Sequence, residues 1–216
     1  MGTRQTAAVL AVQGAFIEHE RRLEELGCRC VELRQARDLE QPFDRLVLPG
    51  GESTVQAKLL HELGMFEPLR ERIAGGMPVL ATCAGLILLA QAIENDPATH
   101  FATLPVTVRR NAYGRQLGSF TARAAWREDG ARSGAGRGET TRGDTACNDA
   151  GPTPLPMTFI RAPKIVEVGP DVEVLASVDD GAGRSPAAVR HGNQVACAFH
   201  PELDTDPRIH RLFLEL

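Results

Sequence analysis

A cysteine at a strand-to-helix junction is the first residue of this chain whose setting could support chemistry. Cys83 ends the apolar run 78–82, the small residues Ala84 and Gly85 follow it, and an apolar, helix-forming run continues to Ala90. This pattern predicts a sharp turn that lifts the cysteine out of the sheet beside the first N–H groups of a helix. The helix dipole there favours the nucleophilic thiolate. From this segment alone, a buried structural cysteine is an equally good interpretation.

A histidine and a carboxylate two residues apart follow another apolar run near the C-terminus. Ala198-Phe199 leads into His200, Pro201 and Glu202. Residues i and i+2 of an extended chain point to the same side, so Glu202 could hold one ring nitrogen of His200 and leave the other free as a base. His200 alone would be an ordinary surface or capping histidine. Together with Cys83, the pair predicts a nucleophile–base–acid triad.

The order of the predicted elements indicates how these residues meet. Predicted strands at 7–12, 28–33, 46–48 and 78–82 alternate with predicted helices at 16–26, 53–63 and 66–74; short strands at 106–108, 117–125, 159–160, 166–168, 172–175, 187–189 and 195–199 and a closing helix at 207–216 follow. This order predicts an α/β fold in one domain, residues 1–216, with an open, mostly parallel sheet flanked by helices on both faces and an antiparallel extension. Ligands of such sheets bind beyond the carboxyl ends of the strands, where Cys83 and His200 are expected.

Two glycines after the third predicted strand provide a candidate oxyanion site. Gly50 and Gly51 follow Leu48-Pro49 and precede Glu52. Glycines at a strand end expose backbone N–H groups and permit close contact with a substrate. A generic tight turn explains the same pair equally well.

Composition excludes several classes of protein. The chain has 216 residues, a formal charge of −4 and a pI near 5.9, which argues against general nucleic-acid binding. It has no apolar run of about 18 residues, so we expect no membrane contact. The polar start at 1–6 lacks a signal-peptide core, so we expect a cytoplasmic protein whose five cysteines are free thiols. Cys28 and Cys30 share one strand face; a metal pair there is conceivable, but two small apolar side chains fit better, and we expect no metal and no cofactor.

One segment differs from the rest in composition. Residues 127–156 are rich in Gly, Arg, Asp, Thr and Ala and nearly lack large apolar side chains. Such a composition contributes little to a core, so we predict a surface insertion that is mobile. Its arginines could contact an anionic partner, although a solvated loop is the simpler interpretation.

Six motifs together carry a family resemblance: Ala11-Val12-Gln13-Gly14-Ala15, Leu48-Pro49-Gly50-Gly51-Glu52-Ser53-Thr54, Thr82-Cys83-Ala84-Gly85-Leu86, Arg110-Asn111-Ala112-Tyr113-Gly114-Arg115-Gln116, Phe159-Ile160-Arg161-Ala162-Pro163 and Phe199-His200-Pro201-Glu202-Leu203. With them the chain resembles the glutaminase subunits of pyridoxal 5'-phosphate synthase, from about residue 7 to 216. These subunits are class I (triad) glutamine amidotransferases with a flavodoxin-like fold. The cysteine elbow and the His-x-Glu motif are shared across that class, whereas the second, fourth and fifth motifs are particular to these subunits.

The resemblance implies a role for each matching residue. Cys83 would attack the side-chain amide of L-glutamine, His200 would shuttle the proton, and Glu202 would orient His200. The glutamine site would comprise Gly50, Gly51, Glu52, Arg110, Ile160 and Arg161, and the oxyanion hole the N–H groups of Gly51 and Ala84. The resemblance also implies a partner, the synthase subunit, which uses the ammonia to make the cofactor and without which the glutaminase is nearly idle.

Two departures from the family pattern leave alternatives open. The elbow usually begins with glycine, and here Ala81 takes that place; its methyl group could be accommodated or could strain the turn. The 127–156 insertion is longer than the family needs. The chain could therefore be a disabled binding module, or the glutaminase subunit of another pathway, although the Arg110–Gln116 and Phe159–Pro163 segments argue against that pathway change. A cysteine peptidase or chaperone on a related fold has less support.

Overall fold

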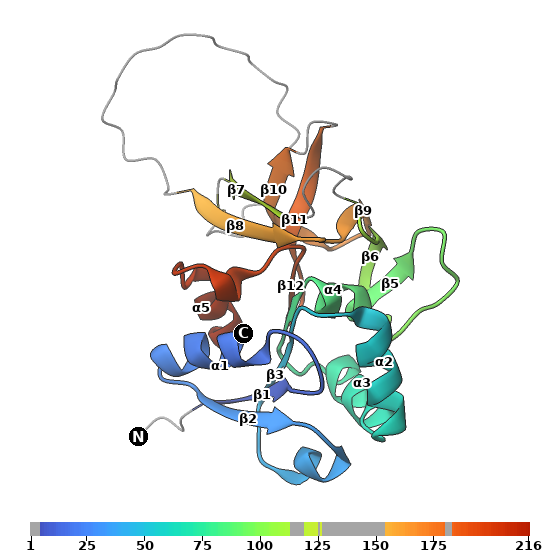
Figure 1. The fold of residues 1–216 in the computed structure, drawn as a ribbon, viewed down its shortest axis with the longest axis vertical. Coiled ribbons are helices and arrows are strands. Elements are labelled where there is room, and N and C mark those ends of the chain that lie inside the picture. Colours follow the sequence, from blue (N-terminus) through green and yellow to red (C-terminus); the bar gives the residue numbers. More distant parts are fainter. Residues whose placement is uncertain (1–4, 113–118, 125, 127–153, 180–182) are drawn as a thin grey trace.

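A seven-stranded sheet organises the molecule, which we describe from a computed structural model covering residues 5–112, 119–124, 126, 154–179 and 183–216 (Figure 1). The strand order is β10-β11-β12-β4-β3-β1-β2. Strands β2, β1, β3, β4 and β12 are mutually parallel, and β11 and β10 continue the sheet in antiparallel pairing. This arrangement confirms the predicted mostly parallel sheet with its antiparallel extension. The strands are β1 Thr6–Leu10, β2 Arg29–Leu33, β3 Arg45–Leu48, β4 Val79–Thr82, β10 Glu173–Asp179, β11 Arg184–His191 and β12 Gln194–Cys197.

Helices cover both faces of this sheet, as the alternating pattern predicted. In Figure 1, α1 (Phe16–Glu25) and α5 (Arg208–Leu214) lie on one side, and α2 (Ser53–Glu62), α3 (Phe66–Ala74) and α4 (Ala84–Leu89) lie on the other. Every residue of β3, β4 and β12 is therefore buried. Such continuous apolar strands are typical of parallel sheets covered on both faces. Two short 3₁₀ helices, η1 (Ala36–Glu40) and η2 (Pro201–Leu203), complete the helical elements.

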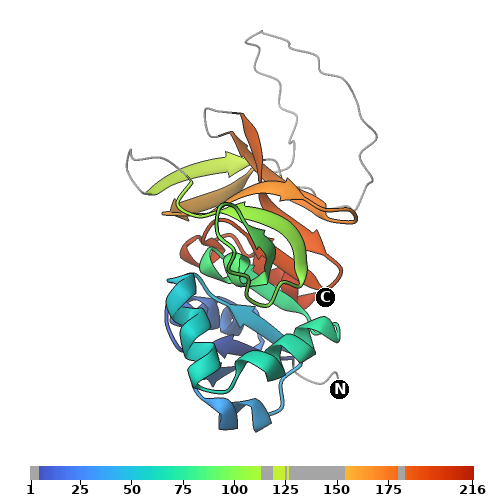
Figure 2. The same ribbon diagram turned by 90° about the vertical axis from the view of Figure 1, so that its right-hand side faces the viewer.

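Two smaller sheets lie together at one end of the molecule (Figure 2). The first contains β5 (Ala90–Ile93), β6 (Leu104–Arg109) and β9 (Lys164–Val168), and the second is the hairpin-like pair β7 (Ser119–Ala124) and β8 (Leu155–Ile160). Phe159 of β8 stacks on Phe120 of β7 with ring centroids 4.5 Å apart, and it also packs near Phe199, with centroids 5.8 Å apart. Since Phe199 directly precedes His200, the contact between Phe159 and Phe199 packs the β7–β8 sheet against the segment that carries His200.

Two boundaries differ from the sequence prediction. The apolar run after Cys83 is helical only to Leu89, and Ala90 begins the unpredicted strand β5. The C-terminal boundary of the predicted insertion 127–156 is also wrong. Leu155 and Pro156 are the first residues of β8, and Leu155 is fully buried. Leu155, Met157 and Phe159 alternate as inward residues of that strand, a period-2 signal that the two flanking prolines obscured. The rest of that insertion, 127–153, lies outside the described residues, as do the ends of the 117–125 prediction.

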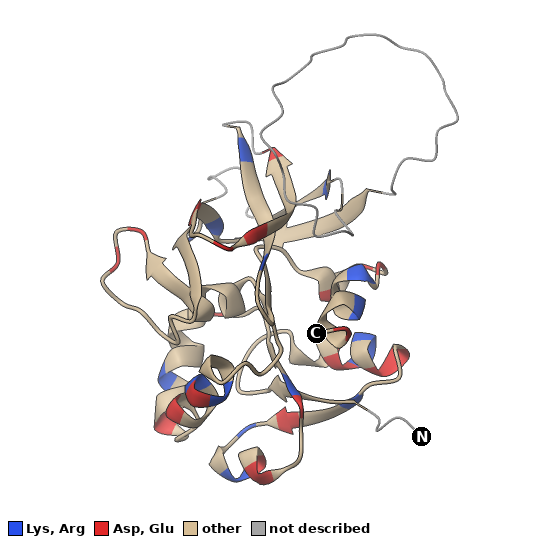
Figure 3. Cartoon of the chain, turned by 180° about the vertical axis from the view of Figure 1, so that it is seen from behind, with Lys and Arg blue, Asp and Glu red and all other residues tan. Residues whose placement is uncertain are grey.

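Charges of both signs are interspersed on the helices at both sides of the sheet in the view of Figure 3. Among the described residues, no helix combines the length and the apolar character needed to cross a membrane.

Candidate active site

Cys83 occupies a strained turn between β4 and α4. Its φ and ψ angles are 48° and −99°, and its N–H donates to the carbonyl of Cys197 at 2.8 Å. A non-glycine residue in such a conformation costs about 1–3 kcal/mol, which the surrounding structure must offset. The hydrogen bond to β12 and the buried strand before Cys83 hold the turn in place. The predicted elbow is therefore present, with the side chain of Cys83 6% exposed.

Gly85 allows the elbow to pack closely against β3. A β-carbon at position 85 would lie 2.1 Å from the carbonyl oxygen of Leu48. Only glycine lets the first turn of α4 lie this close to the backbone of β3.

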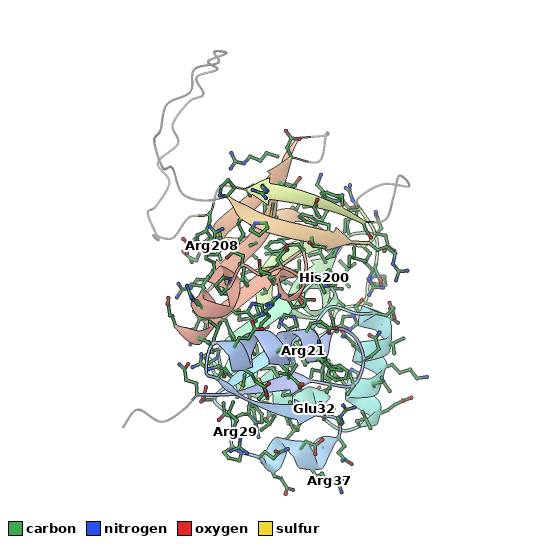
Figure 4. All side chains as sticks on the ribbon, turned by 60° about the vertical axis from the view of Figure 1, so that its left-hand side comes forward. Arg21, Arg29, Glu32, Arg37, His200 and Arg208 are labelled. Carbon is green, nitrogen blue, oxygen red and sulfur yellow. The ribbon has the colours of Figure 1, made fainter. Side chains whose placement is uncertain are left out.

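His200 and Glu202 lie together at the end of β12, next to the elbow. The N–H of His200 donates to the carbonyl of Thr158 in β8 at 2.8 Å, and its Nδ1 lies 2.6 Å from Oε1 of Glu202. Both side chains are buried, Glu202 almost completely. Figure 4 shows His200 near α1, the helix that carries Arg21, and Arg22 of that helix donates to the Glu202 carbonyl at 3.4 Å.

The three predicted triad residues interact. Burial opposes the charged form of His200, but hydrogen bonds with Cys83 and Glu202 and the charges of both raise the pKa of His200 to about 10. The pKa of Glu202 is lowered: burial opposes this, and the neighbouring His19 and His200 outweigh it. The site therefore stabilises an imidazolium at His200, held between the Glu202 carboxylate and the side chain of Cys83. Such a pair is the activated state of a cysteine nucleophile with its base.

Gly50 lies directly against the ring of His200. A β-carbon at position 50 would be 2.3 Å from Cε1 of that ring. The carbonyl of Gly50 accepts from the N–H of Ala15 at 3.0 Å, so the loop after β3 is tied to the loop after β1. The predicted glycine pair thus borders the triad, and a generic turn does not explain so close a contact.

Two glutamines that we had given no role support this glycine loop. Oε1 of Gln13 accepts from the N–H of Glu52 at 2.8 Å and would lie 2.4 Å from a β-carbon at Gly51. The fully buried Gln56 donates to the carbonyls of Gln13 and Pro49 at 3.0 and 3.2 Å. The position of Gln13 directly after a buried strand was a signal for a site residue, whereas Gln56 on a helix gave none.

The residues predicted to bind glutamine form two groups. Ile160 lies at the triad, with its carbonyl oxygen 4.0 Å from Sγ of Cys83, and the exposed Arg161 follows it with φ 43°. Glu52 and Arg110 meet at the start of α2 instead. Glu52 caps that helix by accepting from Val55 N–H at 2.8 Å, and Arg110 donates to Thr54 at 3.3 Å.

Arg110 retains capacity for a further partner. Its Nη1 also lies 3.6 Å from Oδ2 of Asp96, but its buried Nε has no hydrogen-bond partner among the described residues. Ala84, which we expected to supply an oxyanion N–H, is the first residue of α4 and directly follows Cys83. Tyr113 to Gln116, the rest of the arginine motif, lie outside the described residues.

In the described part of the chain, no group of three or more His, Cys, Asp or Glu side chains could hold a metal ion. Cys28 is buried in the core and Cys30 packs against it, in keeping with two small apolar side chains.

Comparison with known proteins identifies the family. The model of the SNO glutamine amidotransferase family matches residues 9–216. The chain belongs to the SNO glutamine amidotransferase family. Within it, the chain is 55% identical to pyridoxal 5'-phosphate synthase subunit PdxT of Desulfitobacterium hafniense strain DSM 10664 / DCB-2, over 96% of this chain and 90% of the relative. It is 48% identical to the subunit of the same name from Bifidobacterium adolescentis, over 96% and 99% of the two chains.

Solved structures agree with this family assignment. A crystal structure of a glutamine amidotransferase matches with a TM-score of 0.78 and 37% identity over 97% of both chains. A glutamine amidotransferase from Thermotoga maritima matches with a TM-score of 0.59 over 100% of this chain and 82% of that one. Its identity is only 17%, so it shows a shared fold alone. The predicted class I amidotransferase-like fold is confirmed.

Proposed function

We propose that this member of the SNO family hydrolyses L-glutamine to L-glutamate and ammonia with the triad Cys83, His200 and Glu202, as the glutaminase subunit of pyridoxal 5'-phosphate synthase. The observation that carries the proposal is a cysteine elbow whose side chain interacts with a histidine, the Nδ1 of which lies 2.6 Å from a buried carboxylate. The proposal treats residues 1–216 as one glutaminase domain. It includes a cytoplasmic location, which the four free cysteines in the described part of the chain support.

The proposed reaction has two halves, formation of a thioester on Cys83 and its hydrolysis. The Cys83 thiolate attacks the side-chain amide carbon of glutamine, and the oxygen becomes an oxyanion near the N–H groups of Ala84 and Gly51. The protonated His200 then gives its proton to the nitrogen, and the C–N bond breaks to release ammonia and leave a thioester. Neutral His200 next removes a proton from water, the hydroxide attacks the thioester, and glutamate leaves as the thiolate is restored. Glu202 holds the imidazole in its orientation throughout.

Substrate binding follows from charge complementarity. Arg110 is suited to the free carboxylate of glutamine, and Glu52 is suited to its ammonium group. Ile160 and Arg161 would border the other side of the substrate, next to the thiol. Glu52 caps α2 and Arg110 contacts Thr54, so both side chains lie at the start of α2, directly after the Gly50-Gly51 loop.

The fate of the ammonia is the second part of the proposal. The PdxT relatives are named as subunits of pyridoxal 5'-phosphate synthase, and the chain matches them over almost its full length. The ammonia would therefore pass to a synthase subunit in a hetero-oligomer. Two alternative functions are the glutaminase subunit of another amidotransferase pathway and a binding module whose active site is disabled.

A glutaminase assay with and without the cognate synthase subunit tests the proposal. We expect glutamate release that rises when the synthase is added and disappears in Cys83→Ala. The matched control is Cys30→Ala, which removes a thiol that lies against the core away from the triad. Wild-type protein that releases no glutamate in the presence of synthase would contradict the proposal.

A labelling experiment separates an enzyme from a binding module. A glutamine-like electrophile should modify Cys83 faster than it modifies a free thiol of the same pKa, because the triad and the substrate site both assist. Labelling at the rate of an ordinary thiol, with L-glutamine giving no protection, would favour the disabled module.

A further inference from the structure

A buried chain of polar side chains continues inward from the triad. Oε1 of Glu202 faces His200, and the other oxygen, Oε2, lies 3.3 Å from Nε2 of His19 on α1. Nδ1 of His19 lies 3.1 Å from Nε2 of His210 on α5. His19 and His210 are completely buried and Glu202 is 2% exposed. Two buried histidines need an explanation, because burying a polar group costs free energy unless the group is hydrogen-bonded.

The second oxygen of Glu202 needs a donor. Among the described residues, Oε2 accepts no hydrogen bond of good geometry. It lies at ion-pair distance, 3.3 Å, from Nε2 of His19. That nitrogen also lies 3.1 Å from Oγ1 of Thr82, the residue before Cys83. His19 therefore contacts the acid of the triad and the strand that carries the nucleophile at the same time.

The protonation states follow from the same distances. A bare lone pair on Nε2 would repel the carboxylate oxygen, so the proton of His19 belongs on Nε2 and its Nδ1 must accept. His210 must then donate through its Nε2, which leaves its Nδ1 unprotonated. Nδ1 of His210 is indeed a buried atom without a partner in the described structure. An unpaired acceptor costs less than an unpaired donor would in that position.

Both histidines are neutral in this arrangement. Burial lowers the pKa of His19; Glu202 and Glu18 oppose that shift, and His200 adds to it. Burial lowers the pKa of His210 well below its ordinary value, and His19 and Arg22 act in the same direction. Of the three histidines, His200 then carries the positive charge, on the side of the carboxylate that faces the thiol.

We propose that His19 is a positioning residue of the triad: its Nε2–H, which lies between Oγ1 of Thr82 and Oε2 of Glu202, attracts Oε2 across 3.3 Å and fixes the orientation in which Oε1 holds His200, and His210 fixes the tautomer of His19. The proposal rests on the proposed glutaminase function and deepens it. A carboxylate held at one oxygen only can rotate about its last bond, whereas one held at both oxygens cannot. Partners of this kind behind an active histidine typically contribute about 10–100-fold to function in metal sites.

Replacement of His19 by leucine and by glutamine tests the role. His19→Leu fills the space without a donor, and His19→Gln places an N–H near the position of Nε2. We expect kcat/KM for glutamine hydrolysis, with synthase present, to fall about 10–100-fold in the leucine variant and to recover most of that loss in the glutamine variant. Arg21→Gln, an exposed change on the same helix, is the control and should leave activity unchanged.

The acidic limb of the pH profile distinguishes positioning from mere packing. Losing a donor raises the pKa of a carboxylate, so the limb of kcat/KM should move to higher pH in His19→Leu and return in His19→Gln. Equal activity losses in both variants with an unmoved limb would overturn the proposal and leave a structural role. If wild-type protein is inactive, the proposed function has failed instead, so the two failures are distinguishable.

A second pair of variants and a spectroscopic measurement guard against a leucine variant that does not fold. His210→Leu frees the tautomer of His19 and should shift the limb in the same direction by a smaller amount, while His210→Gln retains a donor and should not. Nitrogen-15 shifts of His19 in the wild-type protein should report a protonated Nε2 and a bare Nδ1 between pH 6 and 8. A proton on Nδ1 would overturn the proposal without any variant.

Discussion

The ring of His200 rests on the α-carbon of Gly50, so closely that a β-carbon there would lie 2.3 Å from Cε1 and 2.9 Å from Nδ1. Gly50→Ala must therefore displace the imidazole from Cys83 and Glu202. A misplacement of about 1 Å commonly costs about 100-fold in rate, and we expect a loss of kcat of at least that size. A glutaminase assay with synthase measures it.

The control for this variant is a glycine in open space. Gly192 has φ 55°, and a β-carbon added there would meet no atom within 4 Å, so Gly192→Asn should keep full activity. Gly50→Ala with near-normal kcat would show that the base does not act from the position seen in this structure.

The His200–Glu202 pair makes stability depend on pH. Burial works against the imidazolium, yet hydrogen bonds with Cys83 and Glu202 place the pKa of His200 at about 10, above the ordinary 6.5. A group with a raised folded-state pKa contributes stability below its unfolded pKa and loses it as pH rises through the folded value. The advantage of the wild type over Glu202→Gln in free energy of unfolding should therefore shrink from pH 6.5 toward pH 10.

Urea unfolding at a series of pH values measures this advantage. Glu24→Gln, an exposed carboxylate of α1, serves as the control and should show a difference from wild type that is small at every pH. An advantage of the wild type that widens with rising pH would contradict the raised pKa of His200.

Neighbouring arginines offer a matched test of substrate binding. Arg110→Gln removes the proposed partner of the glutamine carboxylate, and a charge-assisted hydrogen bond is worth about 1.5–3 kcal/mol, so KM should rise about 10–100-fold with a smaller change in kcat. Arg109 points to Glu94, with which it forms an exposed ion pair. Arg109→Gln should therefore leave KM near the wild-type value, and equal effects of the two changes would argue against the assigned carboxylate site.

Ala81 is accommodated within β4 rather than strained. It pairs in regular register with Leu48 of β3 and Ala196 of β12, and it is fully buried, while the unusual backbone angles belong to Cys83. Restoring the usual glycine should not raise kcat. It should lower the free energy of unfolding by about 1–2 kcal/mol, because a strand glycine is flexible and a buried methyl is lost. Chemical denaturation beside the activity assay would reveal the contrary result, a faster enzyme of unchanged stability.

The parallel part of the sheet could be predicted from sequence because its strands are mostly apolar and alternate with helices of ordinary length. The triad could be predicted because Cys83 directly follows β4 and His200 and Glu202 follow β12, the parallel neighbour of β4, so the topology brings them to one edge of the sheet. Strand β5 could not, since α4 has only six residues and no polar residue separates the two elements. Close backbone contacts, such as that of Gly85 with the carbonyl of Leu48, depend on how closely two elements approach and leave little trace in a single sequence.

His19 was missed although its spacing held a signal. The apolar residues that define the buried face of α1 are Phe16, Leu23 and Leu26, and position 19 lies three residues after the first and four before the second. A histidine on the apolar stripe of a helix is expected to face the core. His19 should therefore have been predicted as buried, but it was counted among the many polar residues of this helix. What it touches could not be predicted, because its partners lie 63, 183 and 191 positions away along the chain.

The pairing of β7 with β8 has a consequence for how this protein tolerates change. The two strands pair from Ser119 with Ile160 to Ala124 with Leu155, and it is the Ile160 end that meets the thiol of Cys83. The pairing of β7 with β8 thus fixes the position of Ile160 beside Cys83. The length of the connection at the other end of this strand pair, between Ala124 and Leu155, does not affect that position. We therefore expect a short peptide inserted between β7 and β8 to leave the position of Ile160 beside Cys83 unchanged.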